Sequence, residues 1–474
     1  MPVVGEMCLI ARLTAAAARL RLICINSRAA AAGMLRFSFT CDRESVQART
    51  LFSYAAGWLP AAALALFAAL PAAAQEGAEA QLGALVAEAQ QRNPDIQAAQ
   101  RELDAARNRI SPAGALDDPM LEAGVVSVPL PSLSLSREDM TMKMIGLSQR
   151  LPYPGKRGLR RSVAEKEADA AQYNYRELAN RVARDVKAAY FDLGLVDESV
   201  RLVEKNRRIL EQFLAIAEAR YRVGQGNQAD VLKAQTQLSR MIDELIKLGR
   251  ERPAVEAELN RALGRPPEAG PVATQPPRAR EIALRLEELR EAARAERPLL
   301  RAQQSAIERS ARALELANKD YYPDFDVRFS YGQRDNFLDM RRDDLVTLTI
   351  AINLPVWRAE KRDPRVAEAQ AMREQASRMY EARLNELNAM LRQQVAAAEQ
   401  ALKSARLYET GILPQARLAV EASLAAYQVN RVDFFTLLDN QMTVFNYEIG
   451  YVASLAAQNK ALAEIEFLSG QALF

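Results

Sequence analysis

The chain has 474 residues, of which 49% are hydrophobic, 26% charged and 6% aromatic. Seven of its 63 Lys and Arg and three of its 60 Asp and Glu lie before residue 75, which leaves 56 basic against 57 acidic residues beyond it. This near equality of basic and acidic residues excludes nucleic acid as a partner. The chain has no His, and Cys8, Cys24 and Cys41 all precede residue 75. We therefore expect no enzyme, no cofactor and no strong metal site.

Residues 51–74 are predicted to be a secretory signal peptide. The stretch is apolar, follows two arginines and ends in Ala72-Ala73-Ala74, which is typical of a cleavage site with small residues. We expect cleavage before Gln75. An uncleaved membrane anchor is the alternative, but the apolar core is short and contains Pro60.

The remainder of the chain repeats one pattern of helix, two extended runs, long helix, turn and helix. The two copies lie about 204 residues apart, and the matching landmarks keep one order, which chance does not readily produce. The first matches are Leu82, Leu85, Ala89, Pro94, Ala98 and Gln100 with Leu286, Leu289, Ala293, Pro298, Ala302 and Gln304.

This repeat predicts the domain organisation. Residues 1–74 form an N-terminal extension and signal peptide, which begins at Met1 or at the more conventional start Met34. Residues 75–263 form the first repeat and residues 281–474 the second. Residues 264–280 are rich in proline and read as the linker between them.

Four segments alternate between apolar and polar residues, as strands with one wet face do. In the last segment, Val346, Leu348 and Ile350 alternate with Thr347 and Thr349. The segments have about the length of a tilted transmembrane strand. They are residues 120–128, 140–151, 325–331 and 345–354.

Beyond residue 75 no apolar stretch is long enough for a transmembrane helix, so a membrane-spanning part would have to be built from strands. Four strands cannot close a barrel, and an unpaired sheet edge is not tolerated in lipid. Several copies would therefore share one barrel. A soluble four-stranded sheet with one buried face is the alternative.

Long segments with heptad spacing of apolar residues predict two antiparallel helical hairpins. The helix over 157–221 would be about 95 Å long, which exceeds the needs of a compact domain. Pro253 and Pro414 are each expected to kink a helix. The hairpin arms are residues 157–221 with 231–262 and residues 363–427 with 435–456, joined by turns at 223–227 and 430–433.

Together these motifs resemble the TolC-type outer-membrane factors, over roughly residues 81–468. The most specific motifs are Asn93-Pro94-Asp95, Gln149 to Arg157 with the core Tyr153-Pro154-Gly155-Lys156, Tyr221-Arg222-Val223-Gly224 and Asp230 to Gln235. The resemblance implies a mainly helical homotrimer: four strands per protomer form a 12-stranded β-barrel in outer-membrane lipid, and the hairpins form a periplasmic α-barrel. The exit of the second strand most resembles the branch that works with heavy-metal exporters.

The resemblance also implies a gate of acidic rings near the second hairpin turn. Asp439 falls at one such position, Thr436 stands where the other aspartate is usual, and Asp433 lies nearer the turn. A three-fold axis would bring three Asp439 carboxylates together, which would attract cations and exclude anions. An ordinary solvated aspartate near a helix start is the alternative.

The hairpin turns resemble the tips that meet a periplasmic adaptor. They place Val223 and Gly224 in the first copy and Val429 and Asn430 in the second. Asn replaces the usual Gly, yet it tolerates the left-handed conformation that such a turn requires. Simple helix caps are the alternative.

Met140, Met142 and Met144 alternate on the face that the repeat turns toward the lumen. Thioethers bind Cu(I), but flexible filling of the barrel is the favoured interpretation of the three methionines. No metal ligand is assigned.

The function expected from these features is a passive exit duct of a tripartite efflux system. Substrates, heavy-metal cations or drugs, would be delivered by an inner-membrane pump of the resistance-nodulation-division class and a periplasmic adaptor. The alternative is a periplasmic coiled-coil adaptor or scaffold, which normally has one hairpin rather than two.

Overall fold

The computed structural model describes residues 80–336 and 341–474, so the predicted signal peptide lies outside the described residues. Residues 80–92 are helical. No helix in this part of the chain combines the length and apolarity needed to cross a membrane. The further elements are α3 (Pro94–Gly114), β1 (Met120–Val126), β2 (Met142–Leu151), α4 (Lys156–Arg222), α5 (Gln228–Leu263), α6 (Leu286–Glu296), α7 (Pro298–Lys319), β3 (Phe325–Gln333), β4 (Leu345–Ile352), the π-helical turn η1 (Arg358–Arg362), α8 (Asp363–Leu407), the π-helical turn η2 (Tyr408–Ile412), α9 (Leu413–Gln428) and α10 (Phe434–Ser469).

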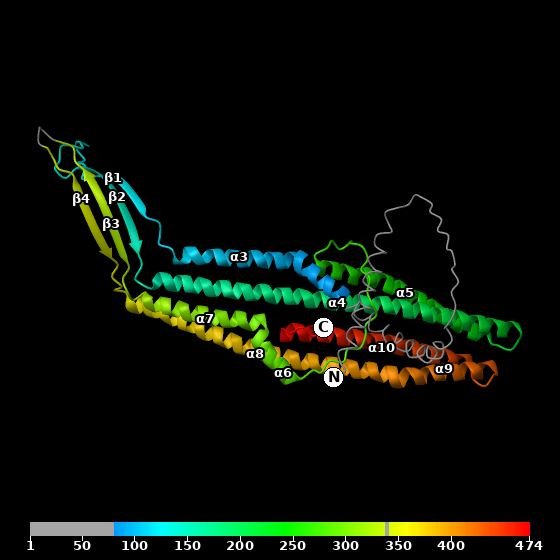
Figure 1. Cartoon of the computed structure of the whole chain (residues 1–474). Coiled ribbons are helices and arrows are strands. Elements are labelled where there is room, and N and C mark those ends of the chain that lie inside the picture. Colours follow the sequence, from blue (N-terminus) through cyan, green and yellow to red (C-terminus); the bar gives the residue numbers. More distant parts are fainter. Residues whose placement is uncertain (1–79, 337–340) are drawn as a thin grey trace, which may run out of the picture. The chain divides into compact units, whose positions relative to one another are not determined.

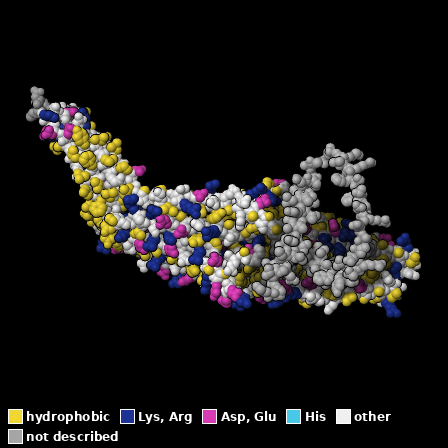
Figure 2. All heavy atoms as spheres, viewed as in Figure 1, with side chains coloured by type: hydrophobic (Ala, Val, Ile, Leu, Met, Phe, Trp, Pro, Cys, Tyr) yellow, Lys and Arg dark blue, Asp and Glu magenta, His cyan; other side chains and the backbone are white. Residues whose placement is uncertain are grey.

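The four strands form one antiparallel sheet in the order β1-β2-β3-β4. Direct pairing places one apolar residue of each strand in a row, and all of them are exposed (Figure 2). The opposite face is polar: the Arg328 guanidinium lies 3.3 Å from the Glu122 carboxylate there. The predicted strands and their two faces are thus confirmed. The apolar row is Leu121, Leu147, Phe329 and Leu348.

The first two strands are shorter than predicted. β1 ends at Val126 because Ser127 has φ +56°, outside the extended region. β2 begins at Met142 because the buried Thr141 hydroxyl donates to the Ser127 carbonyl oxygen, 2.7 Å away. Met140 therefore precedes the strand, and the expectation of three methionines alternating along it is wrong for that residue.

The junction between sheet and helices explains the motif Tyr153-Pro154-Gly155-Lys156. Gly155 has φ +92°, which glycine adopts without strain, and starts α4. The buried Lys156 ammonium lies 2.9 Å from the Asp324 carboxylate, and the Tyr153 amide donates to the same carboxylate at 2.8 Å. Residues that precede β3 are thereby tied to the chain that follows β2.

α4 is the central helix of the described part. Its 67 residues span about 100 Å, and it packs against α3, α5, α7 and α10. The sheet lies at one end of α4, and the turns α4–α5 and α9–α10 lie at the other (Figure 1). We call these pairs the first hairpin (α4–α5) and the second hairpin (α9–α10). Both contribute to one apolar cluster that includes Leu210, Phe213, Leu437 and Phe445.

The helix predicted over 363–427 is interrupted by the π-helical turn η2. Pro414 lies at the start of α9, directly after η2. Because proline lacks an N–H and its ring clashes with the carbonyl four residues earlier, a wider turn relieves the conflict. α5, by contrast, continues as one helix past Pro253.

The segment after α5 crosses the helices without regular structure of its own from 265 to 285. The Thr274 hydroxyl donates to Asp197 of α4 at 2.7 Å. The Gln458 side chain of α10 accepts from the Arg280 amide at 3.2 Å and donates to the Arg280 carbonyl at 2.6 Å. The segment therefore joins α4 to α10.

Gly264 is expected to be sensitive to any side chain. Its φ is +72°, and an added Cβ would lie 2.7 Å from the Arg92 carbonyl oxygen. Gly264→Ala should cost about 2 kcal/mol or more of stability and lower the thermal midpoint followed by circular dichroism. Gly158→Ala is the control, since Gly158 is helical with open space around it, and it should gain about 0.5–1 kcal/mol. Equal effects of the two substitutions would contradict this account.

Candidate functional site

The two hairpin turns have the same hydrogen-bonding pattern. Each is a Schellman motif, in which the amides after the helix bond back to its last carbonyls. Gly224 has φ +74° and Asn430 has φ +59°, so the asparagine adopts the left-handed conformation expected of it. The bonds are Gly224 N–H to Tyr221 O (3.0 Å) and Gln225 N–H to Arg220 O (2.9 Å), and Asn430 N–H to Tyr427 O (3.2 Å) and Arg431 N–H to Ala426 O (2.9 Å).

The predicted tip residues lie at the same end of the helices. Val223 and Val429 are 68% and 64% exposed. Arg220 of α4 joins the two tips: its guanidinium donates to the Tyr427 carbonyl oxygen and lies 4.4 Å from the centre of the Tyr427 ring. The turns of both hairpins are thus brought together as one surface.

The two aspartates predicted for a gate have different environments. Asp433 is the N-cap of α10 and accepts hydrogen bonds from the Thr436 hydroxyl and the Thr436 amide. These bonds hold the pKa of Asp433 below its usual value of 3.8. Asp439 is exposed on α10 one to two turns further along. The Asp433 carboxylate therefore caps the start of its own helix, whereas the Asp439 side chain is exposed on the hairpin.

Phe435, the first apolar residue of the predicted arm 435–456, lies one turn before Asp439 and is 53% exposed. Residues four apart share a helix face. The Lys233 ammonium of α5 lies 4.4 Å from the centre of the Phe435 ring. An aromatic ring and a carboxylate therefore follow each other on the exposed face of α10.

The seam between the hairpins, where α10 packs on α4, contains a buried amide pair. The side chains of Asn206 and Gln441 are both buried. The Gln441 amide donates to the Asn206 carbonyl oxygen at 2.8 Å, while the Asn206 amide faces the Met241 sulfur at 3.2 Å. A polar pair thus interrupts an otherwise apolar core.

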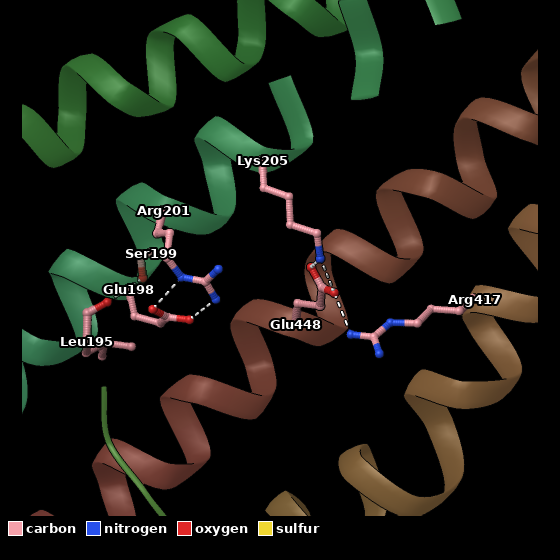
Figure 3. A network of polar contacts seen from close by, with 7 residues as sticks. All are labelled: Leu195, Glu198, Ser199, Arg201, Lys205, Arg417 and Glu448. Atoms are coloured by element: carbon pink, nitrogen blue, oxygen red, sulfur yellow. Dashed lines mark hydrogen bonds and ion pairs between the residues drawn. The ribbon is translucent and has the colours of Figure 1, made fainter. Parts of the chain in front are cut away.

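One heptad further along α10, Glu448 forms an ionic clamp in the same seam (Figure 3). Its carboxylate is 2.8 Å from the Lys205 ammonium of α4 and 2.7 Å from the Arg417 guanidinium of α9. Burial raises the pKa of Glu448, but the hydrogen bonds from Lys205 and Arg417 outweigh it and hold the pKa below the usual range. Glu448 is thus an ionised carboxylate that joins three helices.

The sequence contained a signal for this seam that pattern reading missed. Phe434, Gln441, Glu448 and Leu455 are spaced by seven residues, and all four are buried. Gln441 and Glu448 are polar residues at successive heptad positions of this apolar stripe. Such residues indicate a specific hydrogen-bonding partner on the facing helix, because burial of an unpaired polar group is costly.

The methionines near the start of β2 lie on one face of the sheet or just before it. Met142 and Met144 lie on the polar face of β2, and a side chain at Gly332 would fill the space of the Met142 thioether. Within residues 80–336 and 341–474, no three His, Cys, Asp or Glu side chains come close enough to hold a metal ion.

Comparisons with known proteins agree with this architecture. Residues 85–265 match the family model described as outer membrane efflux protein. The chain is 22% identical over 387 residues to the cobalt-zinc-cadmium resistance protein CzcC of Cupriavidus metallidurans, which covers 80% of this chain and 87% of CzcC.

Solved structures share the fold at low identity. The outer membrane protein VceC of Vibrio cholerae matches with a TM-score of 0.71 at 18% identity, over 83% of this chain and 97% of VceC. The open state of the outer membrane channel MtrE of Neisseria gonorrhoeae matches with a TM-score of 0.68 at 17% identity, over 82% and 89%.

The chain has the fold of the TolC-type outer-membrane channels, and its residues 85–265 are similar to the outer membrane efflux protein family. It resides in the outer membrane and extends into the periplasm.

The ionic clamp generates a prediction about acid stability. Because the pKa of folded Glu448 is depressed, the contribution of its carboxylate to the free energy of unfolding is complete above the ordinary pKa of 4.5. This contribution is lost as pH falls through the lower pKa of the folded state. Glu448→Gln should therefore lower the free energy of unfolding by about 1–3 kcal/mol near neutral pH, and the stability of this variant should fall less than that of the wild type on acidification. Thermal midpoints measured across this range test it. Glu399→Gln, in an exposed pair with Lys403, should match the wild type within about 0.5 kcal/mol.

Proposed function

We propose that this protein is the passive outer-membrane exit duct of a tripartite efflux system. One observation supports this most directly: the sheet with an apolar outer face and the two hairpin turns occupy opposite ends of helix α4, about 100 Å apart. Such a body reaches from a membrane to partners well away from it. The work of transport would come from an inner-membrane pump.

The sheet edges support a homotrimer. Among the described strands, β1 pairs only with β2 and β4 only with β3. Unpaired amides at a lipid-exposed edge are prohibitively costly. Pairing of β1 with β4 of the next copy, three times around, would close a 12-stranded barrel with its apolar face in outer-membrane lipid.

The helices supply matching lateral surfaces for such a trimer. α5 and α8 lie at opposite sides of the helical layer, because α4 and α10 separate them. Each carries exposed apolar side chains that a neighbouring copy would cover, so that the hairpins close into a periplasmic α-barrel. The internal two-fold repeat would make the six hairpins of a trimer pseudo-equivalent. The side chains include Ile242 and Ile246 on α5 and Met372, Met379 and Met390 on α8.

The hairpin end is proposed as the controlled mouth of the duct. Val223, Gly224, Val429 and Asn430 would contact a periplasmic adaptor, which links the duct to a pump of the resistance-nodulation-division class. Three Asp439 carboxylates would ring the mouth, with Asp433 serving the helix start beside them. A negatively charged ring favours cations, and the likeness to a cobalt-zinc-cadmium resistance protein supports heavy-metal cations as substrates before drugs. The chain would carry out no catalysis.

A charged residue on the apolar sheet face should prevent membrane insertion. Leu348 is 65% exposed on that face of β4, whereas Thr349 lies on the polar face. Leu348→Arg should cost about 2–4 kcal/mol in lipid and remove the protein from the outer-membrane fraction that resists high-salt extraction. Thr349→Arg should remain in that fraction. Equal behaviour of both variants would favour a periplasmic scaffold instead.

The acidic ring can be tested by single-channel recording. In a planar bilayer, Asp439→Asn should reduce the preference for cations, because three carboxylates are neutralised together. Asp243→Asn is the control, since Asp243 pairs with Lys247 on α5. Unchanged ion selectivity in Asp439→Asn would remove Asp439 from the gate and leave the duct itself in place.

A further inference from the structure

The two outer strands of the sheet carry opposite charges at one end. Asp117 and Asp118 lie just before β1, and Arg358 and Lys361 lie shortly after β4. These four side chains are exposed, and none forms an ion pair with another residue of the ranges 80–336 and 341–474. Because the strands alternate in direction, β1 begins at the end of the sheet where β4 ends. Unpaired carboxylates and unpaired cations therefore lie beside the two open sheet edges.

The junction between β2 and β3 shows how such charges are used within one chain. The Lys156 ammonium, just after β2, lies 2.9 Å from the Asp324 carboxylate and 3.5 Å from the Asp320 carboxylate, both before β3. The Arg150 guanidinium near the end of β2 lies 3.9 Å from Asp324. Basic residues after one strand thus neutralise acidic residues before its neighbour. β4 and β1 repeat this arrangement of charge, but β2 and β3 separate them within one chain.

The predicted internal repeat supplies the register in which β4 would pair with β1 of a second copy. In the described sheet, Leu151 of β2 lies opposite Phe325 of β3. The repeat matches Leu151 with Leu354 and Phe325 with Leu121, so Leu354 would lie opposite Leu121 of the next copy. Both leucines are exposed, at 73% and 71%, and a slip of one residue would turn the apolar side chains of one strand to the polar face.

The same register brings the unpaired charges together. Continued past the strand ends, it places Arg358 opposite Asp117 of the next copy and Trp357 opposite Asp118 of the next copy. The Arg358 guanidinium also lies 4.9 Å from the centre of the Tyr321 ring of its own chain. A guanidinium has five N–H donors, so this contact leaves donors for a carboxylate. Each edge therefore presents the charge that the other lacks.

We propose that Arg358 binds Asp117 of the next copy, and that this ion pair, supported by Lys361 and by Asp118 of the next copy, sets the register between copies. The site rests on the proposed function, because pairing of β4 with β1 belongs to the homotrimer. Alternation of apolar and polar residues rejects a slip of one residue but tolerates a slip of two, which keeps every side chain on its face. A slip of two residues would move the charges about 7 Å along the strand, so the ion pair rejects the slip that the apolar face accepts.

The experiment exchanges the two charges in the full chain without its leader, refolded into oligomers and checked by circular dichroism. Asp117→Arg and Arg358→Asp should each speed dissociation of the oligomer in SDS about tenfold, because three small contributions change together around the ring. The double variant should return to within about threefold of the wild type, since the two sites are coupled. Arg137→Asp is the control and should match the wild type, because Arg137 is exposed and forms no ion pair at the other end of the described sheet.

The outcomes separate the ion pair from the assembly itself. Single variants that dissociate at the wild-type rate, or at the rate of the Arg137→Asp control, would overturn the ion pair. A double variant that dissociates as fast as Arg358→Asp, with Asp117→Arg unchanged, would also overturn it and assign Arg358 to an anionic lipid headgroup. A wild type that forms no oligomer would instead reject the homotrimer of the proposed function.

A cross-link tests the register even if a charge variant fails to assemble. The chain has no cysteine beyond residue 41, and β1 and β4 are separated within one chain, so a disulfide between them joins two copies. Leu354→Cys with Leu121→Cys should oxidise to covalent oligomers on a non-reducing gel. Leu354→Cys with Ala123→Cys should cross-link about tenfold less, because diagonal neighbours lie about 7–8 Å apart. More cross-linking in the second variant than in the first would overturn the register.

Discussion

The structure depends on α4, a helix of 67 residues that spans about 100 Å and touches most other described helices. Most of the stability of a helix in a protein comes from packing of its apolar face, so the neighbours of α4 must cover its apolar stripe along its whole course. They do so in sequence: α3 and α7 beside the half near the sheet, α5 and α10 beside the half near the turns (Figure 1). The distance between sheet and hairpin turns is set by this one element.

Three lysines of α4 attach the C-terminal half of the chain to this helix. Lys156 binds Asp324 at 2.9 Å, Lys187 binds Glu466 at 2.7 Å and Lys205 binds Glu448 at 2.8 Å. Their carboxylate partners are largely buried, so each bond is stronger and more specific than an exposed pair. The same kind of bond therefore fixes the sheet, the middle of the body and the hairpin seam.

Sequence patterns predicted the elements well and the side-chain environments less well. Alternation located all four strands, because one face of each is apolar along its length. It misplaced the start of β2, since the Thr141 hydroxyl bond to Ser127 depends on a neighbouring strand. Pro414 marked an interruption, and the structure has a π-helical turn there whose Tyr408 packs against Gly450 and Tyr447 of α10. The sequence placed Asp439 at a gate position and Asp433 nearer the turn, but the cap bond from Thr436 to Asp433 became visible only in the structure.

What the sequence by itself determined is local or periodic: strands from a period of two, helices from heptads, and turns from Gly224 and Asn430, whose left-handed conformation is a property of the residue. The tertiary structure alone decided which polar residues meet. Glu448 and Lys205 lie 243 residues apart, and Asn206 and Gln441 lie 235 apart. A polar residue at a buried position needs a hydrogen-bonding partner. Which residue is that partner depends on the register between the helices, which the packing of the whole body sets.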